Sequence, residues 1–182
     1  MFTTLLPLLA AGSALALPAP QTSTTPSTFS GIAIHSGSDI QYAAVSASGS
    51  ALWLNKPTST YCPSQAGSVC ATSTNDTVFA AAQGSTTLSL NVIVPGGQEV
   101  YVAADGRAEY TVPHSASTGT GSSTSGFSSG DGYVKFEGND WLACPEDGAY
   151  AVYAASKKTD GNNCLGFEWK IVDNKGQAWE YA

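Results

Sequence analysis

The chain has 182 residues, of which 42% are hydrophobic and 12% charged, and its formal net charge is −7. Seven Lys and Arg against fourteen Asp and Glu leave no basic stripe that could neutralise phosphates, which argues against nucleic acid and anionic membranes as partners. Four Trp and eight Tyr supply apolar surface for a packed interior, so the composition indicates one globular domain.

The first residues predict a cleaved secretory signal peptide at residues 1–16. An apolar run, Leu5–Leu17, contains the small-x-small pattern Ala14-Leu15-Ala16 that a signal peptidase accepts. A membrane anchor is the alternative, but crossing a bilayer takes about 20 apolar residues, and this run is shorter and interrupted by a proline and a glycine. We therefore expect a secreted chain with no membrane partner.

Two segments contain too little apolar surface to join a core. Residues 17–28 form a Pro/Ser/Thr-rich leader, and residues 115–130 form a Ser/Thr/Gly-rich run with one aromatic residue, Phe127. Such compositions do not offset the entropy lost on ordering, so we expect both segments to be flexible and their hydroxyls to be candidates for O-glycosylation. The remaining chain, residues 29–182, is expected to form a single all-β domain.

The pattern of this domain is β structure throughout. Short apolar or alternating runs recur between Gly, Asn, Asp, Ser and Pro, which predicts a compact β-sandwich or barrel of about a dozen short strands. Alternation is clearest in Thr87–Val92, where Leu88, Leu90 and Val92 share one face. A Pro-Gly-Gly turn leads from this run to Gln98–Val102, so the pair is expected to form a β-hairpin.

Three stretches share the plan of a Gly or Ser turn followed by two strands: residues 37–55, 84–112 and 130–156. Three equivalent units would form a β-trefoil. Unrelated hairpins would give a similar pattern in any all-β protein, so both arrangements stay open.

The four cysteines, Cys62, Cys70, Cys144 and Cys164, suit the oxidising compartment of a secreted protein and predict two disulfides. Three connectivities are open, and we favour the sequential pairs Cys62–Cys70 and Cys144–Cys164 because each encloses a turn-rich segment. A zinc site is not expected, since no C-x-x-C is present and both histidines are remote from the cysteines in sequence. No metal or other cofactor is predicted.

One asparagine lies in a good N-glycosylation sequon. Asn75-Asp76-Thr77 has the N-x-S/T pattern and falls in a polar, turn-rich stretch after Cys70. We expect Asn75 to be glycosylated.

Catalytic patterns are weak. His35 lies beside Ser36, Ser38 and Asp39, but adjacency in sequence does not create a triad, and no G-x-S-x-G elbow is present. We expect His35 to be a strand-end residue that stabilises the turn after it. The acidic residues that could serve a glycoside hydrolase are Glu137, Asp140, Glu146 and Asp147, of which the last three lie in turns that favour short acidic side chains for backbone reasons. The sequence therefore predicts no enzymatic activity.

Aromatic residues suggest a glycan-binding surface, because aromatic faces stack on sugar rings. Trp53 and Trp141 are candidates, with Asp140 as a partner for sugar hydroxyls, and Trp141 is expected to be the more exposed because it follows a polar turn. The alternative is that aromatics fill the core, as is usual in small β domains. Trp169 alternates with charged neighbours in Gly166–Ile171 and is expected to be buried.

Two segments carry a family resemblance: FSGIAIHSGSDIQY at Phe29–Tyr42 and VKFEGNDWLACPEDGAYAVY at Val134–Tyr153. In these runs the chain resembles the fungal phialide-associated cell wall proteins, the PhiA-like family. Cys144 and Cys164 match the family pattern better than Cys70 does. The run at residues 115–130 departs from that pattern.

The resemblance implies a secreted, wall-associated protein with a non-enzymatic structural role in phialide and conidium development, and with IgE-binding relatives. The alternatives are a lectin-like wall module that binds glycans and a secreted effector or allergen-type protein. We expect a monomer whose partners are wall polysaccharide or wall proteins.

Overall fold

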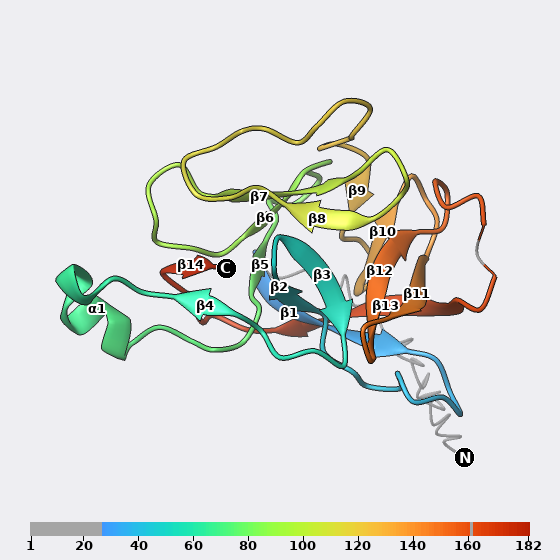
Figure 1. Ribbon diagram of the computed structural model, residues 1–182, viewed down its shortest axis with the longest axis horizontal. Helices are drawn as coiled ribbons and strands as arrows, with labels where there is room; N and C mark the ends of the chain where they lie inside the picture. The colour runs from blue at the N-terminus through green and yellow to red at the C-terminus, as the bar shows by residue number, and fades with distance from the viewer. Residues whose placement is uncertain (1–26, 161) are drawn as a thin grey trace, which may run out of the picture.

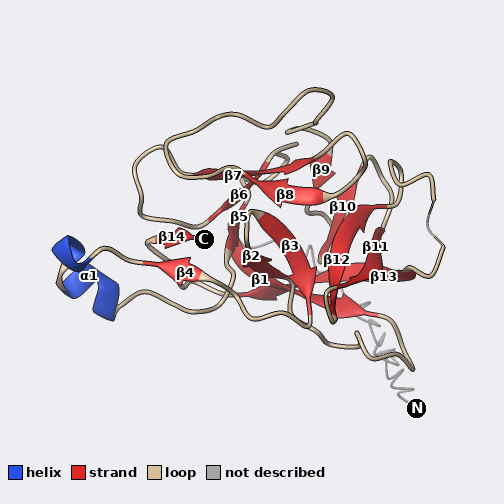
Figure 2. Ribbon diagram, in the orientation of Figure 1, coloured by secondary structure: helices blue, strands red, loops and turns tan. Residues whose placement is uncertain are grey.

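The computed structural model describes residues 27–160 and 162–182. The predicted signal peptide at residues 1–16 and residues 17–26 of the leader lie outside the described residues. Strands dominate the described chain (Figures 1 and 2). The strands are β1 (Thr28–Ile34), β2 (Ser46–Ser48), β3 (Ala51–Leu54), β4 (Thr60–Tyr61), β5 (Phe79–Ala80), β6 (Leu88–Leu90), β7 (Gln98–Val102), β8 (Ala108–Tyr110), β9 (Phe127–Ser128), β10 (Tyr133–Phe136), β11 (Trp141–Glu146), β12 (Ala149–Ala154), β13 (Leu165–Asp173) and β14 (Glu180–Tyr181).

Antiparallel pairing closes most of these strands into a barrel. The order of neighbours is β1-β5-β6-β7-β8-β3-β12-β11-β13, and β13 pairs again with β1. This last pair runs from Phe29 opposite Asp173 to Ile34 opposite Glu168. Strand β2 joins β3, β10 joins β13, and β9 joins β10, whereas β4 and β14 form a separate two-stranded sheet. The predicted all-β class is confirmed, with a barrel in place of a sandwich.

The expected hairpin is confirmed, but the three similar stretches contribute unequal sets of strands. Leu88 pairs with Val100 across the turn between β6 and β7. The first stretch supplies β2 and β3, the second β6, β7 and β8, and the third β10, β11 and β12. Since a trefoil needs three equivalent units, this pairing gives the trefoil alternative no support.

Aromatic rings fill the middle of the barrel. The buried rings that contact one another are those of Phe29, Phe79, Phe127, Phe136, Trp141 and Trp169. Trp169 is central, with ring centroids 4.9 Å from Phe79 and 5.2 Å from Trp141. Phe167 is also buried and Ile171 packs against the core, so the predicted inward face of β13 is confirmed.

Both predicted disulfides are present. Cys62 bonds Cys70 and Cys144 bonds Cys164, and no described cysteine is free. The first bridge spans a segment that projects from the barrel and contains a 3-10 turn, Ser64–Ala66, and the helix α1, Ser68–Ala71 (Figure 1). The second joins β11 to the segment that enters β13.

One expectation about the Ser/Thr/Gly run is wrong, because Phe127 joins the core. Its ring is buried and lies 5.1 Å from the ring of Phe136, while its backbone forms β9 against β10. The residues around Phe127 are small and polar, so the average composition of the run did not predict that this one aromatic side chain is buried in the core. Whether the rest of residues 115–130 is flexible stays a prediction.

The pairing of β1 with β13 includes a very close contact between Gly31 and Trp169. A Cβ atom on Gly31 would lie 1.8 Å from Nε1 of Trp169. That nitrogen is buried and has no hydrogen-bond acceptor within the described residues, so the indole edge packs directly over the glycine backbone. Glycine is therefore required at position 31 for space.

A buried polar network ties β14 to the barrel. The amide of Gln98 donates to the carbonyls of Thr111 and Tyr181 and accepts from the backbone N–H of Tyr181. The Tyr181 hydroxyl donates to the carbonyl of Asp76 at 2.9 Å and accepts from the N–H of Val78 at 2.9 Å. Because each of these groups has a partner, the buried network stabilises the fold.

We predict that Gly31→Ala lowers the free energy of unfolding by about 1–3 kcal/mol, because the added methyl forces Trp169 or β1 to move within a close-packed core. Gly166→Ala in β13 is the matched control, since a Cβ there would meet no atom within 4 Å. Urea unfolding of the two variants measures the difference. Equal stability of Gly31→Ala and Gly166→Ala would contradict the packing argument.

We also predict that stability falls in alkaline solution. Burial raises the pKa of Tyr110 and of Tyr181 to about 12, whereas tyrosines of an unfolded chain titrate near pH 10. Since the folded state retains the two phenol protons, the contribution of these tyrosines to the free energy of unfolding is fully present below about pH 10. It is lost between about pH 10 and 12. Each tyrosine then lowers the free energy of unfolding by up to about 1.4 kcal/mol per pH unit. Urea unfolding across this pH range should show that stability falls less steeply with pH in Tyr181→Phe than in the wild type. The control Tyr61→Phe, which alters an exposed ring, should show the same pH dependence as the wild type.

Candidate functional site

The candidate glycan-binding residues do not form one site. Trp53 lies on the outer face of β3 but is only 4% exposed. Its Nε1 donates to the carbonyl of Ser48 at 2.9 Å, and Lys56 Nζ lies 3.7 Å from the ring centroid. The Arg107 guanidinium is 4.8 Å from the same centroid. Cations therefore occupy the positions above the ring that a sugar would need.

The expectation that Trp141 is exposed is wrong. Its side chain is 0% exposed, and its Nε1 donates to the carbonyl of Val134 at 2.8 Å. The polar turn before it ends at Asp140, and Trp141 is the first residue of β11, where its position on the inward face places it against Phe127 and Trp169. Strand alternation thus decides its burial, whatever the polarity of its sequence neighbours.

Three of the four acidic residues named above, Glu137, Asp140 and Glu146, are engaged in ion pairs. Asp140 lies 3.0 Å from Lys135, and Glu146 lies 3.0 Å from Arg107. Glu137 lies 2.8 Å from Lys157, and this contact, with a hydrogen bond to Ser156, lowers the pKa of Glu137. A general acid in glycoside hydrolysis needs a raised carboxyl pKa, so the direction of this shift is unfavourable for that role.

His35 has a structural position at the end of β1. Its backbone N–H donates to Gln41 Oε1, its carbonyl accepts from the Ser38 hydroxyl at 3.0 Å, and its ring Nδ1 donates to the carbonyl of Gly166. These bonds stabilise the turn after β1 and attach it to β13, as the turn interpretation predicts. Within residues 27–160 and 162–182, no group of three or more metal-ligating side chains is found.

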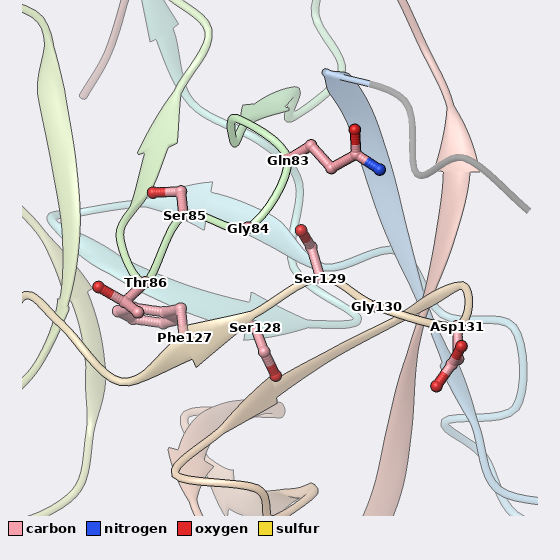
Figure 3. A pocket seen from close by; sticks show the side chains of 9 residues that line it. All are labelled: Gln83, Gly84, Ser85, Thr86, Phe127, Ser128, Ser129, Gly130 and Asp131. Carbon is pink, nitrogen blue, oxygen red and sulfur yellow. The ribbon is translucent and has the colours of Figure 1, made fainter.

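A hydroxyl-rich groove lies where the β5–β6 connection meets β9. One hollow of about 390 Å³ is bounded by the turn 83–86 and the segment 127–131, which Figure 3 shows facing each other. A second hollow of about 400 Å³ shares Ser85 and extends toward the start of β1. The lining side chains that carry polar groups are Ser27, Thr28, Gln83, Ser85, Thr86, Thr87, Ser89, Ser128, Ser129 and Asp131.

Local backbone geometry builds this groove. Ser85 accepts from the N–H of Thr87 at 3.1 Å and shares a 3.0 Å hydrogen bond with its hydroxyl, which fixes the β5–β6 turn. The N–H of Phe127 donates to the carbonyl of Thr86 at 3.0 Å and joins the two walls. Apolar groups of Ala81 and Val134 are among the residues that line a narrow hollow beside the groove.

The chemistry of the groove suits an uncharged, hydroxyl-bearing ligand. Asp131 is the one charged side chain among the residues that line the two hollows. Serine and threonine hydroxyls and the Gln83 amide can each donate and accept hydrogen bonds, as sugar hydroxyls also do. The groove is open to solvent, so it could receive a segment of a long polymer.

The sequence did not reveal this groove because its walls come from three distant segments, near residues 27, 85 and 129. Each segment alone is an ordinary polar turn. The one available signal was Phe127, an aromatic residue inside a polar run, which indicated an attachment point to the core.

The predicted glycosylation site lies elsewhere, in the bend between α1 and β5. Asn75 and Asp76 are exposed, whereas Thr77 is buried.

Among the residues that the structure describes, none forms a helix with the length and apolar character of a membrane span.

Comparisons with known proteins agree with the sequence resemblance. A sequence profile described as "PhiA-like secreted protein" matches residues 29–182. An "Uncharacterized secreted protein" of Arthroderma benhamiae is 34% identical over 112 residues, which cover 52% of this chain and 57% of that protein. The chain thus spans little more than half the length of this relative. No solved structure matches the chain.

We predict that Trp141→Ala acts on folding. Removing a fully buried indole should lower the free energy of unfolding by about 3–5 kcal/mol, because the cavity cannot close within the aromatic core. The control is Tyr61→Ala, where the ring is 54% exposed and the expected change is within about 0.5 kcal/mol. Denaturant unfolding distinguishes them, and a Trp141→Ala protein with wild-type stability would contradict this assignment.

Proposed function

Because the chain belongs to the family of PhiA-like secreted proteins, we propose that it is a non-enzymatic structural component of the fungal cell wall, with a role in phialide and conidium development. The observation that carries this proposal is the family match itself. It extends over residues 29–182 and so includes every described strand, apart from Thr28 at the start of β1, and both disulfides.

The physical character of the fold supports a structural role. Its interior is filled by aromatic side chains, and Glu137, Asp140 and Glu146 are held in ion pairs with lysine or arginine. Two disulfides restrict the unfolded chain, and such bonds persist outside the cell. A protein with these properties is suited to long residence in a wall.

The hydroxyl-rich groove favours a second function, binding of neutral wall polysaccharide. A chain of sugars that lay between the turn 83–86 and the segment 127–131 would meet hydroxyl and amide groups on both sides. Asp131 at the rim would accept hydrogen bonds from sugar hydroxyls, and the sparse charge would give little preference for anionic polymers. Non-covalent binding of this kind would hold the protein in the wall.

We predict that the purified protein sediments with insoluble fungal wall fractions, and that Ser128→Trp weakens this association by about tenfold or more, which corresponds to about 1.4 kcal/mol. Ser128 is exposed and lines the hollow, so an indole at this position would obstruct it. The matched control is Ser36→Trp, an exposed position in the turn beyond the opposite end of β1. β-Glucan and chitin, tested separately as insoluble polymers, identify the polysaccharide.

The outcomes separate the two functions. Wall association that survives both substitutions would support the structural role and remove the groove as the binding site. If isolated walls contain no wild-type protein, and an antibody to the protein does not label the walls, the proposed wall location is wrong.

A further inference from the structure

The sequon at Asn75 combines an exposed acceptor with a buried recognition residue. N-glycosylation moves an oligosaccharide from a lipid pyrophosphate donor to the asparagine side chain. The sugar C1–O bond to pyrophosphate breaks, a C1–Nδ2 bond forms, the amide loses a proton to the enzyme, and the lipid pyrophosphate leaves. The transferase recognises the hydroxyl two residues after the asparagine, here Thr77.

In the folded protein this hydroxyl is not available. Thr77 is 4% exposed, and its Oγ1 accepts from the N–H of Ala47 at 2.8 Å. It also shares a 2.8 Å hydrogen bond with the hydroxyl of Thr58. Both bonds join the sequon to segments that lie earlier in the chain, so an enzyme could reach the hydroxyl only by breaking them.

The backbone of the sequon is held as firmly. The carbonyl of Thr77 accepts from Ser30 Oγ at 2.7 Å. The Tyr181 hydroxyl bridges the carbonyl of Asp76 and the N–H of Val78, one on each side of Thr77. A transferase must bind the sequon in an extended form in its own groove, and these contacts leave no freedom for that without local unfolding.

The order of synthesis leaves time for modification before these contacts form. Tyr181 follows Asp76 by 105 positions, and β13, which closes the barrel on β1, also lies far beyond the sequon. During translocation Asn75 therefore passes the transferase well before Tyr181 can form its hydrogen bonds to Asp76 and Val78. The fold then buries Thr77 and ends the reaction.

We propose that Asn75 is a glycosylation site that is used on the unfolded chain, and that folding to the closed barrel makes an unmodified Asn75 a poor acceptor. Thr77 thus has two successive roles. The transferase first recognises its hydroxyl, and after folding the same hydroxyl bonds to Ala47 and Thr58. The glycan remains on the exposed side of the bend.

The test supplies the mature chain, produced without glycan and with both disulfides formed, to detergent-solubilised oligosaccharyltransferase and a lipid-linked oligosaccharide. A second sample of the same chain is reduced and S-alkylated, and circular dichroism confirms that it is unfolded. Mass spectrometry of the peptide containing Asn75 measures transfer. We expect transfer to the alkylated chain, and less than about one tenth of that rate for the folded chain, because local opening exposes the sequon rarely.

Variants in the alkylated form separate recognition from folding. Asn75→Gln should abolish transfer, and Thr77→Ser, which keeps the hydroxyl, should retain it. Thr58→Val removes a partner of Thr77 but leaves the sequon intact, so its alkylated chain should be modified like the wild type. Transfer to the folded wild-type chain at or above about one tenth of the unfolded rate would overturn the proposal, as would no transfer to the alkylated chain.

Discussion

The pairing of β1 with β13 is the interaction on which the barrel depends. It joins segments from opposite parts of the chain over six opposed positions, from Phe29 and Asp173 to Ile34 and Glu168. Without it the sheet would expose two long edges, which are prone to intermolecular pairing. The contact of Trp169 with the bare backbone of Gly31 lets the two strands approach with the indole inside, and the rings of Phe79 and Trp141 pack against that indole.

Closure around a filled interior moves any binding to the surface of the molecule. On the outer face of β3 and β12, Lys56 and Arg107 cover Trp53, and near β11 the carboxylates of Asp140 and Glu146 are paired with cations. At these places the aromatic ring and the two carboxylates already have partners. The groove between the β5–β6 turn and β9 differs, because its uncharged hydroxyl groups face solvent across an open hollow.

Sequence patterns predicted the parts of this structure that depend on neighbouring residues. Alternation identified the inward faces of β6 and β13, and turn-rich spacing identified both disulfides. The same reasoning failed for Trp141 and Phe127. Each is an apolar residue beside polar ones, and whether such a residue is buried depends on which face of a strand it occupies and what lies opposite.

By itself, the sequence determined the all-β class, the secreted family and the chemistry available at each turn, because strand periodicity, cysteine number and two signature runs are local properties of the chain. Only the tertiary structure decided the closed order of strands, the burial of Thr77 beneath an exposed Asn75, and the meeting of three polar turns in one groove. These features join residues far apart in sequence, and their contacts follow from how the whole barrel closes, which no single segment encodes.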